Sequence, residues 1–141
     1  MSERTNVSNI GVGGQYRTYK IDASTITYDA TKAGGSSQVG LAVTFSADDT
    51  VALCADGDAV IGKLILVESD DKCNVMTHGT MTLPGGASAT LTLGATIVGA
   101  LGASSAKGYI RSAASGTAAE LVKARGYIDN NDTTTAVVVT L

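Results

Sequence analysis

Residues 62–77 constrain the fold more than any other stretch, because they read as two strands joined by a tight turn. Residues 64–67 are an unbroken apolar run, too short for a solvent-facing helix and rich in side chains that suit a pleated surface. A run without alternation predicts a strand covered on both faces, which crosses the middle of the core. Asp70 and Asp71 favour a turn, since aspartate side chains bond their own backbone. Residues 72–77 then alternate, which predicts an antiparallel hairpin with Cys73, Val75 and Thr77 on one face.

Short strand patterns recur along the rest of the chain, divided by turns rich in glycine and aspartate. Short strands at such intervals are typical of an all-β sandwich or barrel. In one of them, over residues 39–45, the alternation predicts that Val39, Leu41, Val43 and Phe45 face the core. The strands expected outside the central hairpin are residues 15–28, 39–45, 51–54, 79–83, 91–93, 97–101, 108–111 and 136–141.

One short helix is expected near the C-terminus, over residues 118–124. Thr117 and Glu120 before and within it fit a capping box, in which each side chain accepts from a free backbone N–H. Residues 129–132 are expected to form a loop before the last strand. The sequence Lys-Gly-Tyr-Ile at 107–110 is echoed by Arg-Gly-Tyr-Ile at 125–128, either as a duplicated element or as two similar strand starts.

The chain of 141 residues is most simply one β-rich domain, residues 15–141, preceded by an extended arm, residues 1–14, that is polar and glycine-rich. Hydrophobic residues make up 44% of the chain but aromatic residues only 4%, so valine, isoleucine, leucine and alanine must fill the core. Small side chains bury little apolar area each. A chain of this composition would therefore gain stability by burying surface between subunits.

Charge and hydropathy exclude two classes of partner. The net charge is −3 and the basic residues are scattered, so no basic stripe is present to displace counterions from a nucleic acid. No apolar run approaches the roughly 20 residues that span a bilayer. The N-terminus lacks the apolar segment of a signal peptide, which predicts a protein made and kept in a cytoplasm. Cys54 and Cys73 are expected to be two buried thiols, with a disulfide as the alternative.

The motifs that suggest catalysis or nucleotide binding each lack an essential residue. Residues 57–64 match a phosphate-binding loop except that Leu64 replaces the Ser or Thr that binds magnesium, and a strand follows where a helix is needed. Residues 11–16 resemble a dinucleotide fingerprint with Tyr16 in place of the third glycine. Residues 86–90 lack the closing glycine of a nucleophile elbow. We therefore expect no cofactor and no enzymatic activity.

The candidate metal ligands are equally incomplete. Cys54, Cys73 and His78 lack the paired cysteine spacing of zinc sites, and His78, the single histidine, is expected to be a turn residue before a glycine. The acidic residues of 56–68 do not follow the spacing of a calcium-binding loop. They are expected to be solvated turn carboxylates, with a weak cation site as the alternative, and no metal site is predicted.

Glycine spacing and strand pattern resemble those of the capsid decoration (cement) proteins of tailed bacteriophages. The resemblance rests on residues 40–53 and 56–64, continues through 67–75, the Pro-Gly-Gly turn at 84–86 and 97–100, and closes with 124–128 and 137–141. It covers roughly residues 15 to 141 and contains no catalytic signature.

The resemblance implies a structural virion protein with a compact β-barrel or β-tulip subunit that forms homotrimers. Such trimers bind the outer surface of an expanded head at local three-fold positions and clamp neighbouring major capsid proteins. Assembly in the host cytoplasm agrees with the absent signal peptide. The alternative from a different class is a trimeric tail-associated or surface β-module that binds host glycan.

Family members often have an N-terminal arm that becomes ordered on the capsid, and this expectation carries over to residues 1–14. Arg4 and Arg17 could pair with acidic capsid side chains, although exposed pairs contribute only about 0–1 kcal/mol. Apolar side chains are the stronger anchors because docking would bury them. The expected capsid-binding residues are Arg4, Val7, Ile10, Val12, Tyr16 and Arg17.

Overall fold

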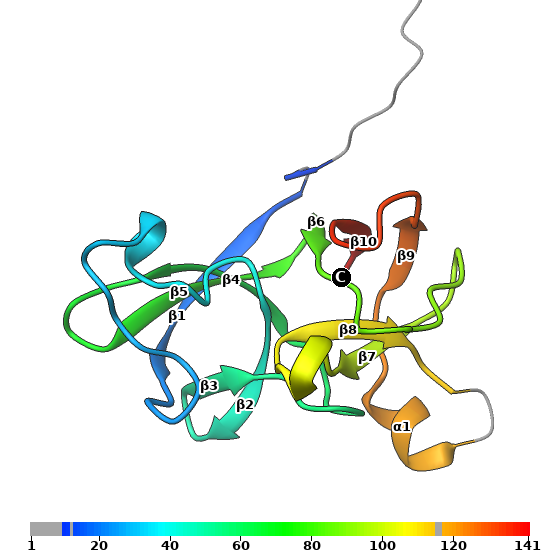
Figure 1. The fold of residues 1–141 in the computed structure, drawn as a ribbon, viewed down its shortest axis with the longest axis horizontal. Helices are drawn as coiled ribbons and strands as arrows, with labels where there is room; N and C mark the ends of the chain where they lie inside the picture. Colours follow the sequence, from blue (N-terminus) through cyan, green and yellow to red (C-terminus); the bar gives the residue numbers. More distant parts are fainter. Residues whose placement is uncertain (1–9, 12, 115–116) are drawn as a thin grey trace, which may run out of the picture.

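The computed structural model describes residues 10–11, 13–114 and 117–141. These residues form an all-β fold in which the first half of the chain closes a five-stranded barrel and the second half adds two small sheets beside it (Figure 1). The barrel consists of β1 (Gln15–Ile21), β2 (Ala42–Ala47), β3 (Thr50–Leu53), β4 (Gly62–Val67) and β5 (Lys72–His78). The other elements are β6 (Thr80–Leu83), β7 (Ile97–Ala100), β8 (Tyr109–Ser112), α1 (Ala118–Lys123), β9 (Tyr127–Asn130) and β10 (Val137–Thr140), with 3-10 turns at Ala33–Gly35 and Ala103–Ser105. The predicted fold class, a small β-barrel with one short helix near the C-terminus, is confirmed.

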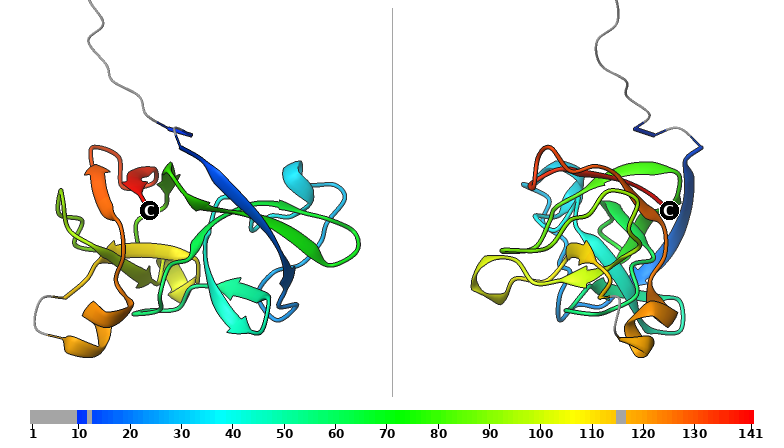
Figure 2. Two further views of the ribbon diagram at one scale, coloured as in Figure 1. Left: turned by 180° about the vertical axis from the view of Figure 1, so that it is seen from behind. Right: turned by 90° about the vertical axis from the view of Figure 1, so that its right-hand side faces the viewer.

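The barrel closes through β1. The strand order is β1-β3-β2-β4-β5, and β1 pairs antiparallel with β5 from Gln15↔His78 to Lys20↔Lys72. On its other edge β1 pairs with β3 in parallel at Lys20 and Ile21. The second half contains a sheet in the order β6-β10-β9 and the hairpin-like pair β7-β8. Figure 2 shows the two halves from behind and from the side, with β1 (blue) as one of the strands of the barrel wall.

The predicted central hairpin is confirmed as β4 and β5, paired antiparallel around the acidic turn. Asp71 in that turn has a φ of 61°, a left-handed conformation that aspartate tolerates better than most residues. The expectation that 64–67 is covered on both faces is wrong. Leu66 is 37% exposed, because β4 lies in a barrel wall whose outer face is only partly covered, and a register shift falls between Leu64 and Leu66.

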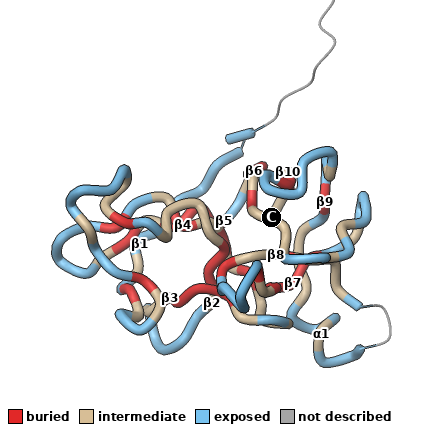
Figure 3. Tube along the Cα trace, in the orientation of Figure 1, coloured by how far each residue is buried: buried red, intermediate tan, exposed pale blue. Residues whose placement is uncertain are grey.

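Two hydrophobic clusters stabilise the molecule, and Figure 3 shows the buried segments in both halves. One cluster fills the barrel, with Val43, Val51, Leu64 and Val75 all fully buried. The other lies where barrel residues meet the second half of the chain. It joins Ala42, Cys54, Val60 and Met76 of the first half to Met81, Leu83, Ile97, Ile110, Ile128, Val137 and Val139. Because this second cluster draws on both halves, they form one packed unit.

The strand predicted at 39–45 is displaced in the structure. β2 begins at Ala42, so Val39 and Leu41 precede it and are only partly buried. Phe45 is 51% exposed rather than inward-facing, because β2 runs past the barrel and its register shifts between Phe45 and Ala47. The ring of Phe45 instead meets Tyr19 edge-on, with centroids 5.3 Å apart.

Other predicted boundaries also differ. The first strand ends at Ile21 and not at residue 28, since a hydrogen-bonded turn over 22–26 follows it. Residues 91–93 form no strand, and β9 extends into the predicted loop as far as Asn130. The echoed sequences each begin a strand, β8 and β9, but these strands belong to different sheets. Each starts after a glycine with positive φ (97° at Gly108, 65° at Gly126) and buries its isoleucine.

The helix α1 forms as predicted, but the capping box does not. Thr117 makes no side-chain capping hydrogen bond. Glu120 accepts instead from the guanidinium of Arg111 and from the backbone N–H of Ala114. The short helix is thus held by contacts to β8 and to the segment after it, and it buries no residue of its own.

Candidate functional site

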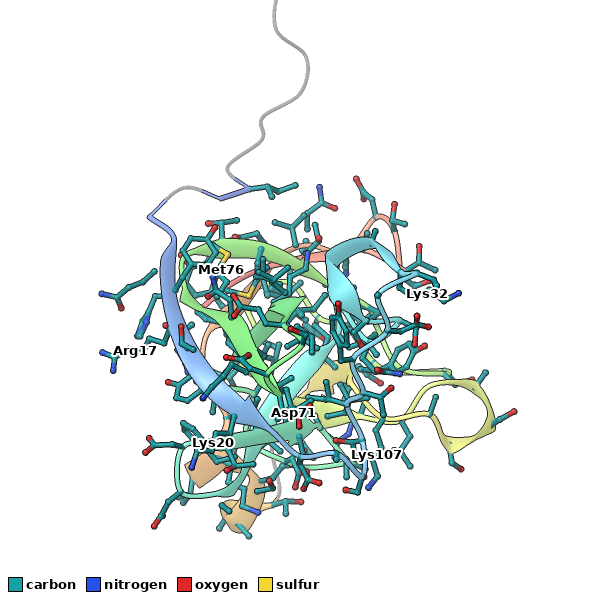
Figure 4. All side chains as sticks on the ribbon, turned by 90° about the vertical axis from the view of Figure 1, so that its left-hand side faces the viewer. Arg17, Lys20, Lys32, Asp71, Met76 and Lys107 are labelled. Carbon is teal, nitrogen blue, oxygen red and sulfur yellow. The ribbon has the colours of Figure 1, made fainter. Side chains whose placement is uncertain are left out.

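Three of the predicted capsid-binding residues, Ile10, Tyr16 and Arg17, lie in the described part of the chain, just before β1 or at its start. Together with the neighbouring Gly11 we name them the arm root. Arg4, Val7 and Val12, also predicted to bind, lie outside the described residues. Ile10 is 54% exposed and Tyr16 is 51% exposed, and Arg17 is exposed as well. Figure 4 shows the Arg17 side chain directed away from the body of the molecule.

The arm root is fixed to the barrel and to the neighbouring strand β6 by backbone and packing contacts. Gly11 N donates to Thr80 O at 2.7 Å, which ties this segment to the start of β6. Tyr16 lies opposite Met76 on β5, and both side chains approach Gly14 so closely that a Cβ there would meet them at 3.2 to 3.3 Å. Thr77 Oγ1 donates to Gln15 O at 3.3 Å. Exposed apolar side chains are therefore held on an anchored backbone.

The residues considered for metal binding are not brought together. Among the described residues no group of three or more His, Cys, Asp or Glu side chains has metal-binding geometry. Cys54 and Cys73 are free, as expected, and they belong to different hydrophobic clusters. His78 is exposed at the end of β5, directly before Gly79, with Nδ1 3.0 Å from Thr77 Oγ1.

The segment that resembles a phosphate-binding loop has a structural role. Lys63 lies within β4, and its Nζ donates to Thr82 Oγ1 of β6 at 3.0 Å. Burial lowers the pKa of Lys63, because a half-buried ammonium loses hydration. The lysine thus connects the barrel to the second half of the chain.

Sequence reasoning missed an ionic cluster centred on Arg111 of β8. Arg111 Nε donates to Asp56 Oδ1 at 2.9 Å, and Nη1 donates to Glu120 and to the carbonyl of Ser112 at 3.1 Å. The hydrogen bonds that Arg111 donates to Glu120 and Asp56 raise the pKa of Arg111, and the hydrogen bond from Arg111 lowers the pKa of Glu120. No sequence signal pairs these residues, since they come from three separate segments.

This cluster borders a groove of about 580 Å³ that we name the Arg111 groove. Its lining mixes small apolar side chains, mostly alanines, with a few polar and charged ones, and contains no aromatic side chain. The lining residues are Asp56, Ala87, Ser88, Ala89, Thr90, Ala100, Leu101, Arg111, Ser112, Ala113 and Ala114. A ligand in this groove would therefore be held by hydrogen bonds and small apolar contacts and not by stacking on an aromatic ring.

None of the helices in the described part of the chain is long and apolar enough to cross a membrane. No protein-family model, curated protein or solved structure matches the chain.

Proposed function

We propose that this chain is a structural virion protein, a capsid decoration (cement) protein that binds the outer surface of an expanded phage head. It acts as a homotrimer at local three-fold positions, with the major capsid protein as its partner. The role is mechanical and uses no catalysis, cofactor, nucleic acid or membrane. The protein assembles onto heads in the host cytoplasm.

The observation that carries the proposal is the arm root, where Ile10 and Tyr16 are each about half exposed on a segment bonded to β6 and to the barrel strand β5. Burying such side chains against a partner supplies the apolar contribution to docking, at roughly 25 cal/mol per Å². Arg17 beside them offers a charge to an acidic partner surface. Aromatic residues and arginine are the side chains most enriched at the centres of protein interfaces.

A trimer multiplies a modest affinity at each arm root. Once one subunit is docked, the other two bind within the same assembly at a high effective concentration. Three moderate contacts can therefore hold a subunit layer on a large shell, provided that the three sites are engaged together. The closed barrel suits this role, because all its strands are paired within the wall and it offers few open edges for unwanted strand pairing.

The proposal is tested by co-sedimentation of the purified protein with expanded heads, together with measurement of its mass in solution. Ile10→Ser and Tyr16→Ala should each weaken binding, and the two together should abolish it. Matched controls are Leu93→Ser and Tyr127→Ala, which remove side chains of similar exposure (59% and 47%) far along the chain. Deleting residues 1–14 should leave the circular dichroism spectrum unchanged but prevent attachment.

Two outcomes would contradict the proposal. Full occupancy of heads by the arm-root double variant would remove this surface from the binding mechanism. A protein that stays monomeric at every concentration, both free and on heads, would contradict the trimer. The control variants distinguish a specific arm-root effect from a general loss of surface hydrophobicity.

A further inference from the structure

The Arg111 groove contains polar groups from three segments that the fold itself does not use. Arg111 donates from Nε to Asp56 and from Nη1 to Glu120 and the Ser112 carbonyl. Its Nη2 makes no hydrogen bond to the described residues. Asp56 accepts through Oδ1 alone and its side chain is 57% exposed. Two hydroxyl groups, those of Ser88 and Thr90, also lack partners within the described chain although both residues line the groove.

The guanidinium is held in a fixed position, and that favours ligand binding. Two carboxylates fix its plane, so little rotamer entropy is lost when a further group binds to it. Its side chain is 21% exposed, which leaves part of it accessible from the groove. The volume of about 580 Å³ lies within the range of small-molecule sites, about 300–1,000 Å³.

Residues 87–90 form one edge of the groove, which we name the groove lip, and their backbone includes a left-handed residue. Ser88 has a φ of 53°, a conformation that costs energy for a residue with a Cβ. The lip folds back through a hydrogen bond from Ala89 N to Gly86 O at 3.2 Å. Its first and last residues are bonded to other segments, because Ala87 N donates to Leu101 O at 3.0 Å and Thr90 O accepts from Ser112 N at 2.9 Å. Ser88 and Thr90 therefore lie on a loop whose two ends are fixed by hydrogen bonds to other segments.

The charges decide the chemical class of the ligand. One guanidinium and two carboxylates give the cluster a formal charge of −1, which disfavours phosphate and carboxylate ligands. The arginine at its centre disfavours a cation. A neutral ligand remains, and it must accept from Nη2 and donate to Asp56 Oδ2 at the same time. Hydroxyl groups do both, so two neighbouring hydroxyls satisfy the arginine and the aspartate together.

We propose that the Arg111 groove binds a neutral, hydroxyl-rich ligand, a sugar unit held by Arg111, Asp56, Ser88 and Thr90. The groove has no aromatic lining, so binding relies on hydrogen bonds and is weak at a single site. This site is separate from the arm root and does not depend on the proposed capsid role. Loss of either activity would leave the other intact.

The experiment is a ¹H–¹⁵N NMR titration of the full-length protein with methyl glycosides of glucose, galactose and mannose, and with glucuronic acid as the anionic comparison. Saturable shifts are expected for amides of residues 87–90 and 111–114 with at least one neutral sugar. Glucuronic acid should bind the native protein more weakly than its neutral counterpart. Asp56→Asn removes one negative charge and one hydrogen-bond acceptor. It should therefore lower the affinity for the neutral sugar and reduce the difference in affinity between the neutral sugar and glucuronic acid.

Two variants test the hydroxyl groups. Thr90→Val keeps the shape of the side chain, and Ser88→Gly suits the left-handed backbone, so both should retain the native spectrum. Each should lower the affinity for the neutral sugar roughly three- to tenfold, as expected for the loss of one hydrogen bond. The matched control Thr18→Val removes an exposed hydroxyl from β1, which does not line the groove, and should change nothing.

Three results would overturn the proposal. The first is the absence of saturable shifts in the groove with every neutral sugar. The second is unchanged affinity in both hydroxyl variants. The third is tighter binding of glucuronic acid than of methyl glucoside to the native protein, since that result would assign the groove to anions.

Discussion

Arg125 Nη2 donates to the backbone carbonyl of Thr77 at 2.9 Å, so a residue that follows α1 is bonded directly to barrel strand β5. Its Nη1 donates to Ile61 O at 3.2 Å, just before β4. Burial lowers the pKa of Arg125, because the guanidinium loses part of its hydration. Backbone carbonyls from two points of the barrel replace the lost water. The arginine therefore links the C-terminal half of the chain to the barrel.

Arg125→Met should destabilise the protein by about 2 kcal/mol, because the hydrophobic stem is kept while two charge-assisted hydrogen bonds are lost. Urea unfolding measures the change. Arg17→Met is the control, since Arg17 is exposed and its replacement should stay within about 0.5 kcal/mol of the native protein. Equal stability of the two variants would show that Arg125 does not link the halves.

Glu120→Gln should make the stability of the protein less dependent on pH in the acid range. The hydrogen bond from Arg111 lowers the pKa of Glu120 below its ordinary value of 4.5. A depressed carboxyl pKa stabilises the fold above that ordinary value and loses the contribution as the pH falls through the folded pKa. The melting temperature of the native protein should consequently drop more steeply below about pH 4.5 than that of the variant. If the melting temperatures of the two proteins fall in parallel with pH, Glu120 does not contribute to the loss of stability in acid.

Gly62→Ala should be strongly destabilising, because a Cβ at this position would lie 2.2 Å from the carbonyl oxygen of Met76. The backbone of β5 would have to move away, at a cost of about 3 kcal/mol or more. Gly57→Ala is the matched control. Nothing lies within 4 Å of its Cβ, so only the positive φ of 79° opposes the change, at about 1–2 kcal/mol. Thermal unfolding of the two variants should rank them in this order.

The two thiols should be unreactive in the native protein at neutral pH. Burial raises the pKa of Cys73 to about 11 and raises that of Cys54 further, with Asp58 adding to the effect. Because the thiolate is the nucleophile, a disulfide reagent should modify neither until the pH is raised or the chain unfolds. On raising the pH, Cys73 should react before Cys54. Rapid labelling of Cys54 at pH 7 would contradict its burial.

The hairpin and the fold class were predictable because turn chemistry and period-two alternation are local properties. Asp70 and Asp71 specify the β4–β5 turn whatever surrounds them. The exposure of Leu66 was not predictable, since it depends on how far the second half of the chain covers the barrel wall. The same applies to Phe45, which passes the end of the barrel and packs on Tyr19.

Among the candidate site residues, too, some could be predicted from the sequence and others could not. Tyr16 and Arg17 fall on a predicted strand, so their position near the arm could be read from the sequence. The Arg111 cluster could not, because its residues are 55 and nine positions apart and meet only through the tertiary fold. Glu120 even carried a misleading local signal, since its spacing from Thr117 suggested a cap that Arg111 and Ala114 pre-empt.

The antiparallel ladder between β1 and β5 decides how the molecule resists a pull on its N-terminus. A force applied through the arm acts along β1, parallel to the strand and across the hydrogen bonds that run from Gln15 to Lys20. These bonds are loaded together in shear, so they cannot open one after another as in unzipping. The parallel contacts with β3 at Lys20 and Ile21 hold the far end of the same strand. Tension on the leading segment is thereby spread around the barrel wall.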